Sequence, residues 1–253
     1  MARTPSNARP LSVDSLDRIK REALAVVRDA CRKSRHCRYA DLRLDLTEYQ
    51  SSRAESGVGK QARSDVQFGF QVRVLAGHPL YAPGYYGHRL GVADLPRLPR
   101  MLREGFAHAY SRAIANARLK EGARARFPRM GDSLADLSLA AIDVRQDTVK
   151  AEYGLDPRTV PLREVARLVT EVSEAVRGVG SRIRFNAISA WTGLTRELFA
   201  SSEGSLIDQS FAETLGWCTV VADSDTADQA LSDSIGHQRG WEVLTEGTRS
   251  QLI

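Results

Sequence analysis

Side chains that could bind a metal ion are few in this chain and poorly spaced. Zinc sites need three or four His, Cys or carboxylate ligands, usually with some of them at helix or turn spacing. No His is followed by Glu, and no two histidines lie three to five residues apart; the five are His36, His78, His88, His108 and His237. Cys31, His36 and Cys37 are close in sequence, but their spacing matches no standard zinc motif. The sequence therefore predicts no metal site and no cofactor in this chain.

The three cysteines are Cys31, Cys37 and Cys218, and none of them forms a C-x-x-C motif. An odd number of cysteines without that motif argues against a disulfide framework. We expect reduced and mostly buried thiols.

Ser201 and Ser202 precede Glu203 and Gly204, and serines beside a glycine could suggest a hydrolase. The nucleophile-elbow motif of hydrolases is G-x-S-x-G, which lies between a strand and a helix. Here the serines lie between two segments with the pattern of strands, and no histidine is nearby in sequence. Small polar residues with glycine are also what a hairpin turn requires. The sequence therefore favours a structural turn at residues 201–204 and predicts no catalytic residue.

Hydrophobic periodicity predicts two groups of elements that position these residues. The first group is a helix from about residue 13, strands over residues 39–46, 66–75 and 80–86, and a helix over about 94–118. The polar segment 50–56 could pair back on the first strand. The second group is a helix over residues 161–177 and strands over 183–192, 194–201, 205–222 and 228–244. Residues 122–154 are the expected linker.

Helices segregated from runs of antiparallel strands predict an α+β fold. We expect a two-layer arrangement of antiparallel sheets with long helices on one side. Residues 1–11 contain two prolines and no apolar periodicity, so they are expected to form a disordered arm. Residues 12–253 would then form one domain, which could divide into sub-units at 12–120 and 160–245.

Composition and charge indicate an ordinary globular protein. The chain has 253 residues, 42% of them hydrophobic and 26% charged, and a formal net charge of +5. No apolar run approaches the roughly 20 residues needed to span a bilayer, and the N-terminus lacks the apolar core of a signal peptide. We therefore expect a cytoplasmic protein. The basic charge permits a nucleic-acid partner, but no recognition motif accompanies it, so nucleic-acid binding is not expected.

Four segments resemble the TldD/PmbA proteins, a family of bacterial and archaeal metallopeptidases once described as modulators of DNA gyrase. Residues 39–44 (YADLRL) resemble the family's first strand, and residues 68–75 (FGFQVRVL) resemble its G-x-G-V-R-V strand. The most specific segment runs from Ile183 through Phe211 and is centred on Ser201-Ser202-Glu203-Gly204. Residues 236–242 take the place of a later strand that leads out of the domain. The resemblance covers about residue 12 to the end of the chain.

The resemblance implies that the chain is the non-catalytic amino-terminal part of such a protein. In the family this domain helps to form the dimer and encloses a cavity, while a carboxy-terminal domain binds zinc through a His-Glu-x-x-x-His helix. That metal domain has no counterpart here, so zinc is expected only in a missing domain or in a partner. The implied partners are an unfolded or leader peptide and a metal-bearing subunit in a homo- or heterodimer. Residues 201–204 would contact the peptide or the partner.

Two alternatives remain open from the residues alone. The first is a basic regulatory or binding protein with no proteolytic role. The second is an independent hydrolase built on Ser202 or on a cysteine.

Overall fold

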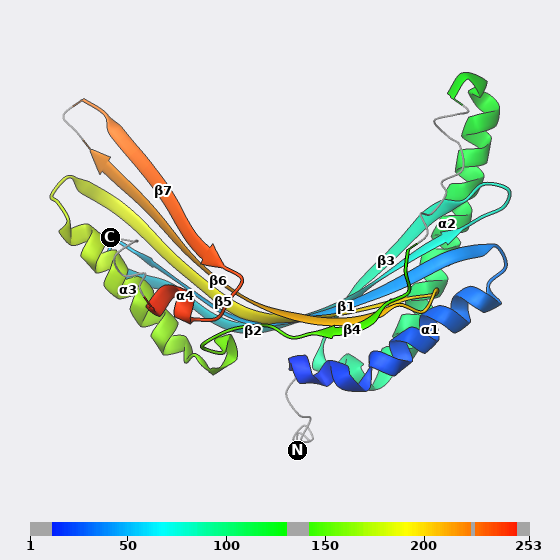
Figure 1. Cartoon of the computed structure of the whole chain (residues 1–253). Coiled ribbons are helices and arrows are strands. Elements are labelled where there is room, and N and C mark those ends of the chain that lie inside the picture. The colour runs from blue at the N-terminus through cyan, green and yellow to red at the C-terminus, as the bar shows by residue number, and fades with distance from the viewer. Residues whose placement is uncertain (1–11, 131–141, 224–225, 247–253) are drawn as a thin grey trace, which may run out of the picture. The chain divides into compact units, whose positions relative to one another are not determined.

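The computed structural model describes residues 12–130, 142–223 and 226–246. The described strands form one seven-stranded sheet in the order β3-β2-β1-β5-β6-β4, with β7 also paired to β6 (Figure 1). They are β1 (Cys37–Glu55), β2 (Val58–Ala76), β3 (Ala82–Leu90), β4 (Gln146–Val149), β5 (Ile183–Ser201), β6 (Leu206–Asp223) and β7 (Asp228–His237). The described helices are η1 (Val13–Arg18), α1 (Lys20–Lys33), η2 (Val92–Arg97), α2 (Leu98–Arg126), η3 (Pro128–Met130), η4 (Pro157–Thr159), α3 (Leu162–Gly178) and α4 (Glu242–Thr245). The fold is α+β, with an antiparallel sheet packed against long helices, as the sequence predicts.

The chain divides into two compact units. Unit 1 comprises residues 1–46, 67–149 and 196–209, and unit 2 comprises residues 47–66, 150–195 and 210–253. The units interleave along the sequence because β1, β2, β5 and β6 each contribute one segment to each unit. The expected arm at residues 1–11 lies outside the described residues.

In unit 1, helices bury one face of the sheet, and no described helix covers the other. Side chains alternate between the two faces of a strand, and in β2 the even-numbered residues are the buried ones: Phe68, Phe70, Val72 and Val74. Helix α2 packs directly on this face, because Gly105 lies against the rings of Phe70 and Tyr86. Helix α1 contacts α2. The odd-numbered residues of β1, β2 and β3 therefore lie on the uncovered face.

Unit 2 has its own core under α3 and α4. Val165, Val169 and Val176 of α3 pack with Ile188 and Ala190 of β5 in one cluster of buried side chains. Trp241, which is 1% exposed, belongs to the same cluster, and its indole N–H donates to the Glu164 carboxylate at 3.1 Å. Large apolar side chains with one satisfied polar atom are typical of such cores.

Several predicted boundaries are wrong for physical reasons. Residues 183–192 and 194–201 form the single strand β5. Gly193 is no turn here: it fits within the strand because the Trp191 ring and the Tyr49 Cβ occupy the space that a side chain would take. Segment 50–56 does not pair back on β1; instead β1 continues to Glu55 between β2 and β5. Strand β7 ends at His237, and Glu242–Thr245 is helical, so residues 228–244 are not one strand. The expected linker contains β4, which pairs in parallel with β6.

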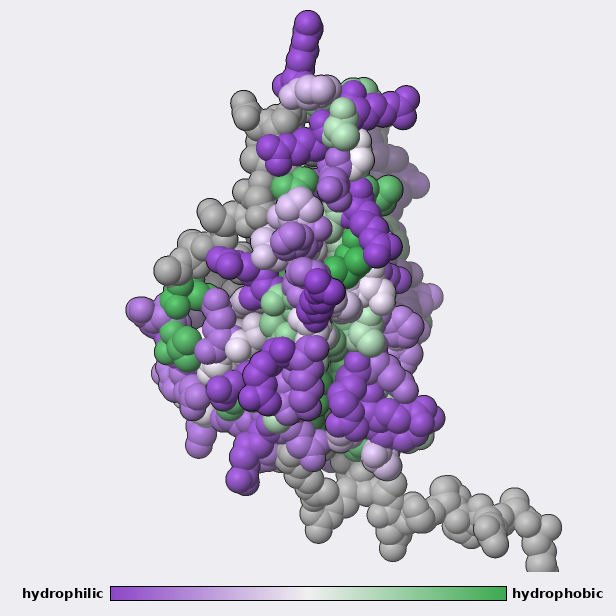
Figure 2. Space-filling view, turned by 90° about the vertical axis from the view of Figure 1, so that its right-hand side faces the viewer, coloured by the Kyte–Doolittle hydropathy of each residue, from purple (hydrophilic) through white to green (hydrophobic). Residues whose placement is uncertain are grey.

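No helix among the described residues has the length and apolar character needed to cross a membrane. On the face turned to the reader in Figure 2, apolar residues are interspersed among hydrophilic ones.

Candidate functional site

Residues 201–204 form the tight turn between β5 and β6. The Ser201 N–H donates to the Ser205 carbonyl at 2.9 Å, and the Gly204 N–H donates to the Ser201 carbonyl at 3.1 Å. Gly204 has a φ of 110°, which favours glycine because it has no Cβ. Ser201 is fully buried, and its hydroxyl accepts the Ser205 N–H. This turn is therefore a hairpin connection, as the sequence indicates.

Ser202 fastens the turn to β1. Its backbone N–H donates to the Ala40 carbonyl at 2.8 Å, and its Oγ accepts the Ala40 N–H at 3.0 Å. None of the hydrogen bonds of the described residues joins Ser202 to a histidine, the partner that activates a hydrolase serine. Glu203 is exposed and lies on the rim of a hollow beside α1. A contact between residues 201–204 and a peptide or partner stays a prediction.

A group of charges centred on the buried Asp208 fastens η1 and α1 to the β5–β6 hairpin in unit 1. The guanidinium of Arg196 donates to both carboxylate oxygens of Asp208 at 2.8 and 2.7 Å, and it also contacts Asp17. Lys20 donates to Asp208 at 2.9 Å. Arg196 holds the pKa of Asp208 below its ordinary value. Because each charge has an opposite partner, this group is suited to structure rather than to proton transfer.

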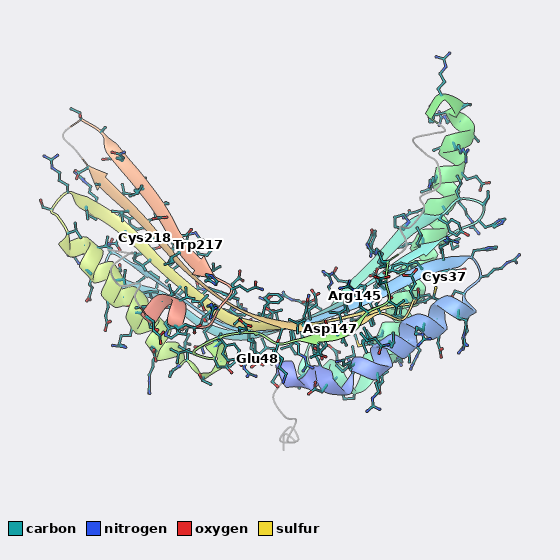
Figure 3. All side chains as sticks on the ribbon, in the orientation of Figure 1. Cys37, Glu48, Arg145, Asp147, Trp217 and Cys218 are labelled. Carbon is teal, nitrogen blue, oxygen red and sulfur yellow. The ribbon has the colours of Figure 1, made fainter. Side chains whose placement is uncertain are left out.

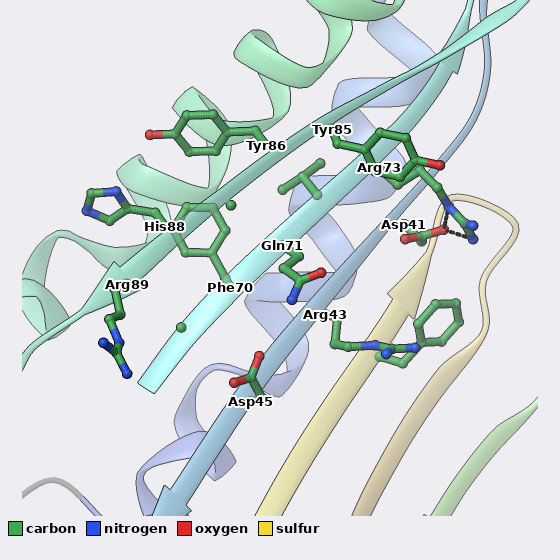
Figure 4. Close-up of a pocket in the computed structure, with 14 residues that line it drawn as sticks. Asp41, Arg43, Asp45, Phe70, Gln71, Arg73, Tyr85, Tyr86, His88 and Arg89 are labelled. Carbon is green, nitrogen blue, oxygen red and sulfur yellow. Dashed lines mark hydrogen bonds and ion pairs between the residues drawn. The ribbon is translucent and has the colours of Figure 1, made fainter. Parts of the chain in front are cut away.

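The uncovered face of unit 1 carries an open hollow of about 550 Å³ (Figure 4). Its floor contains Gly69 and Gly87, whose opposite residues across β2 and β3 are Arg89 and Gln71. Because these glycines have no side chains, a ligand could approach the backbone of the sheet closely. The other lining residues are Asp41, Arg43, Asp45, Phe70, Val72, Arg73, Tyr85, Tyr86, His88 and Phe199.

Charges of both signs surround this hollow. Arg73 Nε donates to Asp41 at 2.8 Å, and Figure 4 shows the two side chains meeting at one end of the hollow. Arg43 pairs with Glu197 at 3.5 Å. Burial, followed by the negative charge of Glu197, raises the pKa of the Asp45 carboxyl. A carboxylate with a raised pKa in a hollow is a candidate contact for a cationic group of a ligand.

Asp45→Asn is expected to raise the free energy of unfolding at pH 7. The pKa of Asp45 is raised in the folded state, so the folded protein holds this proton up to a higher pH than the unfolded chain does. The free energy of unfolding therefore falls as pH rises from the ordinary value of 3.8 through the raised value. Asparagine does not ionise and so avoids this loss of stability. The difference in unfolding free energy between the variant and wild type should therefore shrink as pH approaches 3.8. Urea unfolding across this pH range measures the effect. The matched variant Asp41→Asn should lose stability at pH 7, because it weakens the contact with Arg73; an equal response of both variants would contradict this account.

Histidines and cysteines do not form a metal site in the described part of the chain. No group there brings together three or more His, Cys, Asp or Glu side chains that could hold an ion. The rings of His36 and His78 lie 4.8 Å apart, and Tyr86 stacks on His108 at 5.0 Å. Cys31, Cys37 and Cys218 are free thiols.

The two outer edges of the sheet differ. Near the start of β3, three side chains of α2 donate to backbone carbonyls: Arg112 to that of Tyr85, Asn116 to that of Pro83, and Lys120 to that of Tyr81. Strand β7 pairs with β6 over its whole length, and no described segment pairs with its other edge. An unpaired edge presents N–H and C=O groups that can accept another strand.

Sequence reasoning found the turn at residues 201–204 but not the hollow. Gly69 lies in a segment that the sequence predicts to be a strand, whereas nothing in the sequence singles out Gly87 before the β2–β3 register is known. The free edge of β7 likewise depends on which strands pair.

Solved structures match this fold, although no family model matches the chain and no curated protein matches its sequence. A candidate modulator of DNA gyrase from Bacteroides thetaiotaomicron has a TM-score of 0.61 at 12% identity, over 92% of this chain and 49% of that one. TldE from Thermococcus kodakarensis has a TM-score of 0.54 at 8% identity, over 88% and 43% of the two chains. A candidate modulator of a DNA gyrase from Thermotoga maritima gives 0.51 at 8%, over 79% and 40%. The chain therefore has a fold found in TldD/TldE/PmbA-family structures, and it spans about half or less of their length.

Proposed function

We propose that this chain is the non-catalytic, amino-terminal part of a TldD/PmbA-like zinc metallopeptidase. It would take part in dimerisation and hold an unfolded or leader peptide for a metal-bearing domain or partner. The observation that carries this proposal is the structural match, which covers 92% of this chain but only 49% of the matched protein. Because the matched region is about half of the larger protein, we expect this chain to act together with a domain or subunit that corresponds to the other half.

The edge of β7 is the surface best suited to hold an extended peptide. Its residues are exposed except for the half-buried Ile235, and no described segment pairs with its outer edge. The Ser234 N–H donates to the Asp233 carboxylate, and an added strand would have to displace this contact if it used that N–H. Strand addition supplies main-chain hydrogen bonds and places few demands on peptide sequence, as unfolded substrates require. The edge of β3 is less suited, because α2 already occupies its first outward carbonyls.

Peptide binding at β7 can be tested with two neighbouring proline variants, Ala230→Pro and Leu231→Pro. Backbone groups along a strand point alternately toward and away from its partner, so one proline removes an outward N–H and the other an N–H bonded to β6. We expect the proline that removes the outward N–H to weaken binding of a fluorescent unfolded peptide, measured by anisotropy, with little loss of protein stability. The inward variant should mainly destabilise the β6–β7 pair. Unchanged peptide affinity in both variants would contradict strand addition at β7.

The role in proteolysis needs a second assay. The purified chain is combined with a TldD-like subunit that carries the His-Glu-x-x-x-His helix, and cleavage of the same peptide is followed with each subunit alone and with both. We expect a complex of the two chains, and faster cleavage in that complex than with either subunit alone. Cleavage by this chain alone, or cleavage that its addition leaves unchanged, would contradict the proposal.

A basic regulatory or binding protein without a proteolytic role is the second candidate. Four arginines line a hollow beside α1, which favours an anionic partner. Binding to DNA, RNA or an acidic protein that falls steeply with rising salt would support this function. Failure to retain such partners at low salt would remove it.

A further inference from the structure

Cys31 and Cys37 meet where α1 ends and β1 begins. Their sulfur atoms lie 2.9 Å apart, and both are free thiols. A disulfide bond has a sulfur–sulfur distance of about 2.05 Å. A side-chain shift of roughly 1 Å would therefore bring the two atoms to bonding distance. Figure 3 labels Cys37 in unit 1 and Cys218, the remaining cysteine, on β6 in unit 2.

The two thiols share a hollow of about 680 Å³ with an excess of positive charge. Its charged lining residues are Arg21, Arg28, Arg32 and Arg38 together with Asp29 and Glu203. Asp29 is engaged with Arg32 at 3.5 Å and with Lys33 at 3.9 Å. Positive charge in a hollow raises the local concentration of anionic reagents.

The surroundings distinguish the two thiols. Ser202 Oγ accepts the Ala40 N–H, so its own hydrogen is available to the Cys31 sulfur. Hydrogen bonds from Cys37 and then Ser202 outweigh burial and lower the pKa of Cys31 to about 7. The same bond to Cys31, followed by burial, raises the pKa of Cys37. Both thiols line the hollow, with Cys31 buried and Cys37 half-buried. The lower pKa of Cys31 decides the order, so that Cys31 attacks at neutral pH and Cys37 follows.

We propose that Cys31 and Cys37 form a thiol–disulfide exchange site for anionic low-molecular-weight disulfides such as oxidised glutathione. The Cys31 thiolate attacks one sulfur of the reagent, forms a mixed disulfide and expels one glutathione thiolate, which takes up a proton. Cys37 then loses its proton to solvent, and its thiolate attacks the Cys31 sulfur. The Cys31–Cys37 bond forms, the mixed disulfide breaks and a second glutathione thiolate leaves. Two protein thiols are thus oxidised while one glutathione disulfide is reduced to two thiols.

The full reduced chain provides the test, with Cys218 as its internal control. The pKa of Cys218 is raised by burial and by Asp233. After oxidised glutathione at pH 7 and alkylation of the remaining thiols, tryptic digestion separates residues 29–32 from residues 36–38. We expect these two peptides to be joined by a disulfide, and the Cys31–Cys37 pair to react about tenfold faster than Cys218. The larger thiolate fraction of Cys31 should outweigh the lower intrinsic nucleophilicity that goes with its lower pKa. A lasting glutathione adduct on Cys31 with Cys37 alkylated, or no reaction, would overturn the proposal.

Two further comparisons test the roles of charge and of Ser202. The rate at Cys31 relative to Cys218 should be higher with oxidised glutathione than with cystamine, a cationic disulfide, and added salt should reduce the difference. Equal ratios would overturn the preference for anions. Ser202→Ala should shift the pH profile of Cys31 alkylation to higher pH without changing the joined peptides, and Ser202→Thr should restore it. An unchanged profile would remove Ser202 as a positioning residue.

Discussion

Asp208→Ala is expected to lower the free energy of unfolding by about 3–5 kcal/mol, the usual result of removing one partner from a buried ion pair. The Asp208 side chain is only 4% exposed and the Arg196 side chain only 14%. Without the carboxylate, the guanidinium would keep only the exposed Asp17 as an ion-pair partner, and the half-buried Lys20 ammonium would lose its ion-pair partner. The β5–β6 hairpin and α1 should loosen together because both depend on this contact.

Urea unfolding at pH 7 measures this loss, with Glu104→Ala as the control. Glu104 forms an exposed pair with Arg100 on α2 at 3.0 Å, so its removal should cost about 0.5 kcal/mol or less. The pKa of Asp208 is lowered in the folded protein, so its contribution is present above the ordinary value of 3.8 and is lost as pH falls through the lowered value. The difference between wild type and Asp208→Ala should therefore narrow in acid. Similar losses in both variants at pH 7 would show that the buried charges contribute little.

Gly84→Ala is expected to destabilise unit 1 by about 3 kcal/mol, at the upper end of the usual range for overpacking. A Cβ at this position of β3 would lie 2.1 Å from the Ala109 carbonyl oxygen and 2.4 Å from the Ala113 nitrogen. Both atoms belong to the backbone of α2, so no side-chain rotation can relieve the clash. The helix must move away from the sheet, which separates its buried residues, including Leu102 and Phe106, from β2 and β3.

The control for this variant lies in α2 itself. A Cβ at Gly122 meets no atom within 4 Å, so Gly122→Ala should stabilise the protein by up to about 1 kcal/mol through helix propensity alone. Thermal unfolding of the two variants should thus show shifts of opposite sign. A small effect of Gly84→Ala would indicate that α2 is not held directly against the β3 backbone.

Local pattern was enough to locate the elements whose periodicity is strong. The stripe of α3 and the alternation of β2 gave their types and approximate places, because each buries one face only. Gly193 shows the limit of that reasoning. Glycine is a turn signal in sequence, but here its missing side chain makes room for Trp191, which is a contact between residues on one strand face. Strand β4 could not be foreseen either, because its partner β6 lies about 60 residues away in the chain.

The candidate site was predictable only where one segment carried it. The Ser-Ser-Glu-Gly turn is continuous in sequence, and its hairpin role follows from residue types. Residues of β1, β2, β3 and β5 line the hollow, so a role for Asp45 or Gly87 can be recognised only when these strands are aligned. The number and spacing of the cysteines did not predict the contact between Cys31 and Cys37. It arises because the end of α1 and the start of β1 bring the two sulfur atoms together.

The three α2 side chains that bond the start of β3 also limit what copies of this chain can build together. A sheet with two receptive ends can join head to tail without stopping, and such open-ended growth is the route to fibres. Here Arg112, Asn116 and Lys120 occupy the carbonyls of Tyr85, Pro83 and Tyr81, at the start of β3 and just before it, and Pro83 has no N–H to offer there. Strand addition at this part of β3 is therefore hindered, whereas no described segment pairs with the outer edge of β7. Two copies that met through β7 would each cover the other's β7 edge, so such a pair would compete with a peptide for that edge.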